Sequence, residues 1–236
     1  IFLLRGYGGR LKGPVLVDPE KHSGADVGDE AFLLAAAAPT IVSANRPEGA
    51  AFAAALEASL ILMDDGFQNP ALAKDLTLAL VDAQTGTGNG LCLPAGPLRA
   101  PLSAQIRKAG ALVVVGEGTR AAKAVHLAAR RGLPIIEAKL APTNGAEFEG
   151  QKVLAYAGIG RPEKFFASLA AAGAEVVETR AFGDHHPYSE AEAQGLLTRA
   201  ETQGLQLVTT AKDMARIESA EGEIYRRAGG GHAHRT

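Results

Sequence analysis

Cysteine is nearly absent from this sequence: Cys92 is the single one among 236 residues. One thiol cannot form a disulfide within the chain, and it cannot build a zinc or iron–sulfur site from cysteine ligands. Long apolar runs are also missing. The uncharged stretch 31–45 is interrupted by Pro39 and by polar residues, whereas a membrane-spanning helix needs about 20 mostly apolar residues. We therefore expect no transmembrane segment within this sequence.

Neither sign of charge is in excess. The chain carries 24 Lys and Arg against 26 Asp and Glu, a formal net charge of −2, and its isoelectric point is about 6.3. This balance indicates no nucleic-acid partner and no polybasic contact with a membrane. Hydrophobic residues make up 47% and charged residues 21%, as in ordinary globular proteins. The length allows one large domain or two modest ones.

Short apolar runs typical of buried strands alternate with alanine-rich stretches typical of helices. The predicted strands are 1–4, 15–17, 40–44, 60–63, 76–81, 111–115, 134–138, 152–158, 175–181 and 205–209. The predicted helices are 28–38, 49–58, 101–108, 119–131, 161–172, 189–203 and 212–219. Continuous apolar strands separated by helices indicate a mostly parallel sheet flanked by helices. The predicted fold class is α/β.

A domain boundary is predicted near residue 145. The segment 141–145 reads Ala-Pro-Thr-Asn-Gly, which favours a turn, and a new strand and helix alternation begins at Lys152. We predict a larger domain over 1–145 and a smaller C-terminal α/β domain over 146–236.

Two segments near the N-terminus carry candidate polar groups. Arg5–Arg10 reads Arg-Gly-Tyr-Gly-Gly-Arg directly after a predicted strand. Its glycines permit close backbone approach to a ligand and its arginines suit a phosphate or carboxylate, but a tight turn with solvated arginines explains it equally well. Asp29 follows Val27-Gly28 at the start of a helix. Acidic residues are favoured there by the helix dipole, and a carboxylate so placed can also take a proton from a substrate hydroxyl.

The segment 60–68 predicts a phosphate-linked metal site. Four apolar residues precede Asp64 and Asp65, and Gln68 follows three residues after Asp65. A buried strand would hold the two carboxylates at the carboxyl edge of a sheet, where ligands bind in open α/β folds and where acids hold Mg²⁺. Adjacent buried carboxylates repel one another unless a cation is near, so we favour a functional role over a structural one.

Three later segments are less decisive. The glycine- and proline-rich stretch 86–98 ends at Arg99, which could reach a phosphate or serve a purely structural loop. Residues 183–189 read Gly-Asp-His-His-Pro-Tyr-Ser, and His185 with His186 suits acid–base chemistry better than metal binding. Ser189 and Glu192 also match a capping box. Residues 209–213 end a strand in Thr-Thr-Ala-Lys-Asp, which could cap a helix or place Lys212 near an anion.

Taken together and in this order, these segments resemble the tetraacyldisaccharide 4′-kinases, the lipid A 4′-kinases of Gram-negative bacteria. The matching stretches are 5–10, 27–30, 64–68, 82–99, 158–166, 184–189 and 209–217. The resemblance implies a P-loop-kinase-like fold. It also implies transfer of the γ-phosphate of ATP, with Mg²⁺, to the 4′-hydroxyl of a lipid A disaccharide precursor at the cytoplasmic face of the inner membrane.

The resemblance also implies roles for individual residues. Asp29 would be the catalytic base, with His185 or His186 as its partner across an interdomain cleft. Asp64 and Asp65 would hold Mg²⁺, and together with Gln68 they would bind at the phosphates of ATP. The arginines Arg5, Arg10 and Arg99 would contact anionic groups of the substrate.

The sequence departs from the family pattern in places. The Walker A loop and an N-terminal membrane helix are expected to precede Ile1, so we expect this chain alone to bind ATP poorly and to turn over little. Ala100 stands where glutamate is usual, while Asn69 and Leu4 replace common residues in ways we expect to be tolerated. Two alternatives stay open: a metal-dependent phosphohydrolase that uses the two acids and the two histidines, and a non-catalytic relative that binds lipid or nucleotide.

Overall fold

The computed structural model of the chain describes residues 1–140 and 144–214. By their internal contacts these residues form two compact units. The first joins residues 1–64 with the described residues from 144 onward, and the second comprises Asp65–Leu140. This grouping does not follow the predicted boundary at residue 145, and the division into domains 1–145 and 146–236 stays a prediction.

The N-terminal part of the first unit is a small sheet with helices on both faces. Its strands, in the order β2-β3-β1-β4, are β1 (Phe2–Leu4), β2 (Val15–Leu16), β3 (Thr40–Val42) and β4 (Leu62–Met63). Leu4 and Val42 pack against the helices α1 (Gly24–Val27) and α2 (Asp29–Ala35). Leu3 points to the other face, where α3 (Arg46–Ala55) approaches it so closely that a Cβ on Gly49 would lie 2.6 Å from its Cδ1 atom.

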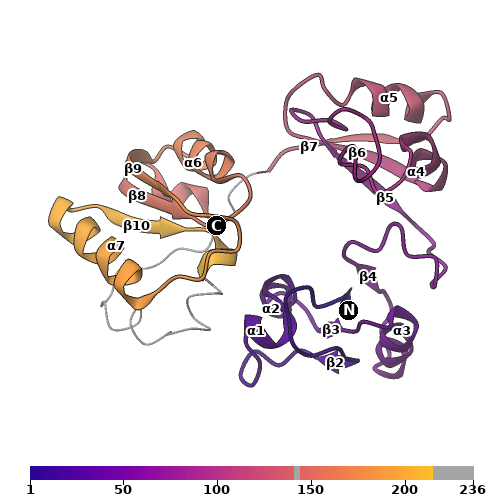
Figure 1. Cartoon of the computed structure of the whole chain (residues 1–236), viewed down its shortest axis with the longest axis horizontal. Coiled ribbons are helices and arrows are strands. Elements are labelled where there is room, and N and C mark those ends of the chain that lie inside the picture. Colours follow the sequence, from indigo (N-terminus) through magenta and orange to yellow (C-terminus); the bar gives the residue numbers. More distant parts are fainter. Residues whose placement is uncertain (141–143, 215–236) are drawn as a thin grey trace. The chain divides into compact units, whose positions relative to one another are not determined.

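The C-terminal part of the first unit is a three-stranded parallel sheet covered on both faces. Strand β8 (Lys152–Ala157) lies between β10 (Gln206–Thr209) and β9 (Glu175–Ala181). Alternate residues of β8 pack toward α6 (Pro162–Ala171) and α7 (Glu190–Gln203), which lie on opposite faces of the sheet (Figure 1). Burial on both faces explains why this strand is apolar throughout.

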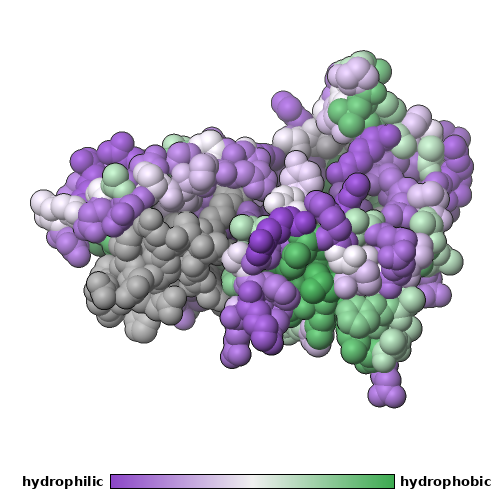
Figure 2. All heavy atoms as spheres, turned by 60° about the horizontal axis from the view of Figure 1, so that its bottom comes forward, coloured by the Kyte–Doolittle hydropathy of each residue, from purple (hydrophilic) through white to green (hydrophobic). Residues whose placement is uncertain are grey.

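The second unit is a parallel sheet with helices on one face. The order is β5 (Leu78–Asp82), β6 (Ala111–Val115) and β7 (Ile135–Ala138), and the helices are α4 (Leu102–Lys108) and α5 (Ala122–Ala129). Val81 and Leu112 pack with both helices. Leu78 and Leu80 alternate with the residues that face the helices, and they are 45% and 68% exposed. Hydrophobic side chains therefore reach the surface of this unit. Figure 2 colours green the hydrophobic residues on the face of the molecule that it shows.

The predicted fold class is confirmed. Each predicted strand range contains a strand, and every ladder among them is parallel except the antiparallel pair β2 and β3. The described strands form three separate sheets. The one-turn helix α1 and the 3₁₀ turn Gly145–Phe148 were not predicted. Residues 211–214 begin the helix predicted over 212–219, whose remainder lies outside the described residues. Among the described helices, none has both the length and the apolar character that crossing a bilayer requires.

Candidate functional site

The glycine-rich loop after β1 lies against the start of α2. Gly6 has a φ of +72°, and a Cβ there would lie 2.4 Å from Cγ1 of Val42. A Cβ on Gly9 would lie 2.6 Å from the carbonyl carbon of Val27. Both glycines therefore allow the loop to pack closely against the protein itself, Gly6 against a side chain and Gly9 against backbone, which accounts for them without any ligand.

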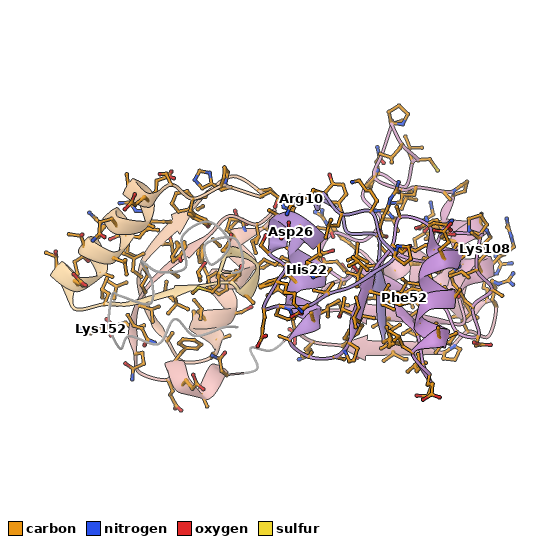
Figure 3. The ribbon with its side chains drawn as sticks, turned by 90° about the horizontal axis from the view of Figure 1, so that it is seen from below. Arg10, His22, Asp26, Phe52, Lys108 and Lys152 are labelled. Atoms are coloured by element: carbon orange, nitrogen blue, oxygen red, sulfur yellow. The ribbon has the colours of Figure 1, made fainter. Side chains whose placement is uncertain are left out.

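The two arginines of this loop have different surroundings. Arg5 is exposed, whereas Nε of Arg10 donates to Oδ1 of Asp26, the residue beside it in Figure 3. The Ser23 backbone amide is the largest influence on Asp26, and with the Arg10 guanidinium and the Ser23 hydroxyl it lowers the pKa of that carboxyl from 3.8 to about 2. Arg10 thus helps to fasten the turn before Asp29. The substrate contacts of both arginines stay predictions.

Asp29 is the first residue of α2, and the structure brings it together with His185. The turn before it requires Gly28, whose φ is +90° and whose added Cβ would lie 2.5 Å from the carbonyl oxygen of Tyr7. Oδ2 of Asp29 lies 3.8 Å from Nδ1 of His185, and the two side chains are 21% and 59% exposed. The ring of Tyr7 lies 6.5 Å from the ring of His185, between centroids. A carboxylate and an imidazole from distant parts of the chain therefore meet at the start of a helix.

His186 has different partners. Its ring stacks on Phe182 with centroids 4.8 Å apart, and its Nε2 atom lies 3.1 Å from Oε1 of Glu192. His185 instead adopts a φ of +57°, an uncommon conformation for a residue other than glycine and one that recurs at functional sites. Of the two predicted partners, His185 is the one that the structure places beside Asp29.

The strand before Asp64 and Asp65 differs from the prediction. We expected a buried strand, but β4 has two residues, lies at the edge of its sheet and exposes half of the Leu62 surface. Both aspartates are exposed. The expected repulsion between buried carboxylates was therefore wrong, because edge strands keep one side open to solvent.

Arg46 supports this turn from the first turn of α3. The residue is 5% exposed, and its Nη2 atom donates to the carbonyl oxygen of Asp64 at 3.2 Å. The sequence analysis did not identify this arginine. Its position directly before Pro47 marks a helix start, but nothing local indicates that its guanidinium turns toward Asp64.

Asp65, Gln68 and Arg99 meet in the second unit. Nη1 of Arg99 donates to Oδ1 of Asp65 at 2.5 Å and lies 3.4 Å from Oε1 of Gln68. The hydrogen bond that Arg99 donates to Asp65 raises the pKa of the Arg99 guanidinium, so Arg99 keeps its positive charge. Nε2 of Gln68 in turn donates to Gln105 at 3.1 Å. The structure thus joins residues that were predicted separately, and it shows that Arg99 first neutralises an acid of the chain itself.

Asp64 and Asp65 suit Mg²⁺, which takes some of its ligands from phosphates and water, better than they suit an ion coordinated by protein groups alone. Mg²⁺ is usually bound through one or two carboxylates, with phosphates and water completing its shell, and Asp64 with Asp65 provides such a pair. Within residues 1–140 and 144–214 no group of three or more His, Cys, Asp or Glu side chains could hold a metal ion. The phosphohydrolase alternative would combine Asp65 of the second unit with Asp64, His185 and His186 of the first, and it stays an alternative.

A second contact joins the start of α2 to the chain after β10. Nζ of Lys212 lies 2.7 Å from Oε1 of Glu30, and the two side chains are 44% and 52% exposed. The sequence analysis considered Lys212 for an anionic ligand, and its partner here is a carboxylate of the chain. Exposed pairs of this kind contribute little to stability.

The sequence of this chain is similar to those of known kinases. A family model described as tetraacyldisaccharide-1-P 4′-kinase matches residues 1–226. Among curated proteins, a tetraacyldisaccharide 4′-kinase of Methylobacterium nodulans is 57% identical over 221 residues, which cover 93% of this chain and 66% of the relative. One of Rhodopseudomonas palustris strain HaA2 is 51% identical over 222 residues, with 93% and 66% covered. The chain thus spans just under two thirds of the length of these relatives.

A solved structure is also similar. It is the crystal structure of LpxK from Aquifex aeolicus, titled as an "apo" form in complex with ATP, with a TM-score of 0.66 and 27% sequence identity. The similarity covers 93% of this chain and 70% of that chain. It supports the α/β assignment independently of the strand pattern.

Proposed function

This chain belongs to the tetraacyldisaccharide-1-P 4′-kinase family, and on that premise we propose that the protein transfers the γ-phosphate of ATP to the 4′-hydroxyl of tetraacyldisaccharide 1-phosphate. The match of the family model to residues 1–226 carries the proposal. Within the chain, the pairing of Asp29 with His185 supports it, because phosphoryl transfer to a sugar hydroxyl needs a base at the attacking oxygen.

Asp29 is proposed as that base. As the 4′-oxygen forms its bond to the γ-phosphorus, the bond from that phosphorus to the β,γ-bridging oxygen breaks and ADP leaves. The proton of the hydroxyl passes to the Asp29 carboxylate. His185 then holds the carboxylate in one orientation through Nδ1, at 3.8 Å in the absence of substrate. Catalytic hydrogen bonds are often this long before substrate binds and shorten in the complex.

Asp64, Asp65 and Gln68 are proposed to bind the magnesium ion and the phosphates of ATP. When bound there, Mg²⁺ supplies charge neutralisation to the phosphates. Arg46 fixes the backbone of Asp64, and Arg99 fixes the side chain of Asp65. Arg5, Arg10 and Arg99 remain proposed contacts to anionic substrate groups, since each keeps guanidinium donors beyond its described bonds.

The lipid precursor and the cytoplasmic face of the inner membrane are proposed as substrate and location. The substrate named in the family description is a lipid phosphate, so the protein must meet it at a membrane or extract it. Six exposed cations lie on or next to the helices α4 and α5, and Glu117 is the single acid between residues 100 and 136. Those cations are Arg107, Lys108, Arg120, Lys123, Arg130 and Arg131. The charge of the whole chain is balanced and by itself indicated no such contact, but this local excess of positive charge suits anionic headgroups.

The test uses the protein with whatever sequence its gene encodes around this chain. Tetraacyldisaccharide 1-phosphate, Mg²⁺ and γ-labelled ATP are incubated with it, and lipid-phase label and ADP are measured together. Equal amounts of labelled bisphosphate and ADP are expected. Phosphate release from the substrate without ATP would instead support the hydrolase, and ATP or lipid binding without transfer would support the non-catalytic relative that Ala100 keeps open. Sedimentation with anionic and with neutral vesicles tests the membrane contact.

A further inference from the structure

Asp213 is a buried carboxylate that the proposed reaction does not use. It follows β10, it is 0% exposed, and its oxygens accept hydrogen bonds from three described groups. The donors are the Gly158 amide at 3.1 Å, the Tyr188 hydroxyl at 3.1 Å and the Thr210 hydroxyl at 2.6 Å. Burying a carboxylate is costly unless donors surround it, so this arrangement calls for an explanation.

The Gly158 peptide connects Asp213 to His185. Its N–H donates to Oδ1 of Asp213, and its carbonyl oxygen accepts the backbone N–H of His185 at 3.1 Å. The position admits no larger residue without adjustment, because a Cβ would lie 3.0 Å from the Tyr188 hydroxyl and 3.1 Å from Oδ1 of Asp213. The backbone of a single residue therefore joins the buried carboxylate to the backbone that carries the histidine.

Tyr188 provides a second connection to the loop 183–189. Its hydroxyl donates to Asp213, and its ring packs edge-on against His186 with centroids 5.1 Å apart. Asp213 thus holds the segment at two points, at the backbone of His185 through Gly158 and at Tyr188. The backbone of His185 has a φ of +57°, and a strained conformation persists only where its surroundings hold it.

We propose that Asp213 is a positioning residue for His185: through the backbone of Gly158 and the side chain of Tyr188 it fixes the loop that presents the imidazole to Asp29. This inference rests on the proposed function. It assigns Asp213 no contact with substrate, and its effect on the reaction passes entirely through the histidine. Small displacements of a catalytic group cost large factors in rate.

The primary test is Tyr188→Phe, which deletes one hydroxyl donor and leaves the ring in place. We expect kcat to fall about tenfold and KM for ATP to stay within about twofold, since misplacement acts on the chemical step. In a His185→Ala background, Tyr188→Phe should cause no further loss, because the residue acts through the deleted imidazole. The kcat of Asp213→Ala should fall toward that of His185→Ala. Asp213→Asn keeps the acceptor for the Gly158 amide, so its kcat should be higher than that of Asp213→Ala.

Thr209→Val is the matched control. It removes a buried hydrogen bond of the same sheet, from Thr209 to the carbonyl oxygen of Tyr156 at 2.8 Å, without touching the loop. We expect it to lower stability and leave kcat unchanged. The imidazole resonances of His185 provide a readout independent of turnover: they should shift or broaden in Tyr188→Phe and not in Thr209→Val.

The outcomes separate this inference from the proposed function. If the wild-type protein transfers no phosphate, the kinase proposal fails, and the His185 resonances still test the positioning. If the wild-type protein is active, three results would each overturn the role of Asp213: an unchanged kcat in Tyr188→Phe, a full additive loss in the His185→Ala background, or His185 resonances that match those of wild type.

Discussion

Replacing Asp29 with asparagine tests the proposed base most directly. The side chain keeps its size and its place at the first turn of α2, 3.8 Å from His185 before the change, but it can no longer accept a proton at neutral pH. General base catalysis contributes about 10²–10⁴-fold to rate. We therefore expect kcat to fall by that factor, which corresponds to about 3–5 kcal/mol in the activation barrier.

The folded structure should survive this change. Asp29 belongs to the first turn of a helix, where loss of a negative charge costs about 0.3–1 kcal/mol, and asparagine keeps its hydrogen-bonding groups. The expected loss of activity is thus several times larger than the expected loss of stability. Initial rates at saturating ATP and lipid measure the loss of activity, and urea unfolding followed by circular dichroism measures the loss of stability.

Glu30→Gln is the matched control for Asp29→Asn. It removes a carboxylate from the next position of the same turn and breaks an exposed ion pair with Lys212. We expect kcat within about twofold of wild type, because exposed pairs contribute only about 0–1 kcal/mol. A kcat within threefold of wild type in Asp29→Asn would refute the assigned base. So would an equal loss in both variants, which would indicate a general effect of charge at this helix start.

Three further predictions concern charge and packing. Folding lowers the pKa of the Asp26 carboxyl to about 2, so as the pH falls from about 4 to 2 the unfolded chain takes up this proton before the folded chain does. The free energy of unfolding should therefore fall in this window. Urea titrations should show a smaller fall in Asp26→Asn. Gly9→Ala should lower the free energy of unfolding by about 1–3 kcal/mol, because its Cβ would lie 2.6 Å from a backbone carbon. Gly195→Ala, at an exposed site in α7 with open space around it, should raise the free energy of unfolding by about 0.5–1 kcal/mol and with it the melting temperature. Arg99→Ala should lower kcat/KM for Mg-ATP at least tenfold by releasing Asp65, and Arg99→Lys should restore only part of it, because one amine cannot reproduce the guanidinium geometry; an unchanged value would remove Arg99 from the site.

Much of the fold could be predicted because its signals are local. Strands buried on both faces, such as β8, need apolar residues at every position, and this makes them visible in the sequence. The capping box of Ser189 and Glu192 was confirmed for the same reason, since it closes within one turn. The one-turn helix α1 was missed because four residues carry no periodicity. Strand β4 was misjudged because an apolar sequence does not reveal whether a strand lies at an edge.

The site divides along the same line. Residue types and their order determined the α/β class, the resemblance to a kinase family and the set of candidate acids, arginines and histidines. Only the tertiary structure decided that His185 rather than His186 faces Asp29, that Arg99 neutralises Asp65, and that Asp213 lies beneath the histidine loop. The reason is physical. A side chain forms a hydrogen bond only with groups that tertiary packing brings within about 3 Å of it. Adjacent residues, such as the two histidines, can therefore have different partners that their sequence does not reveal.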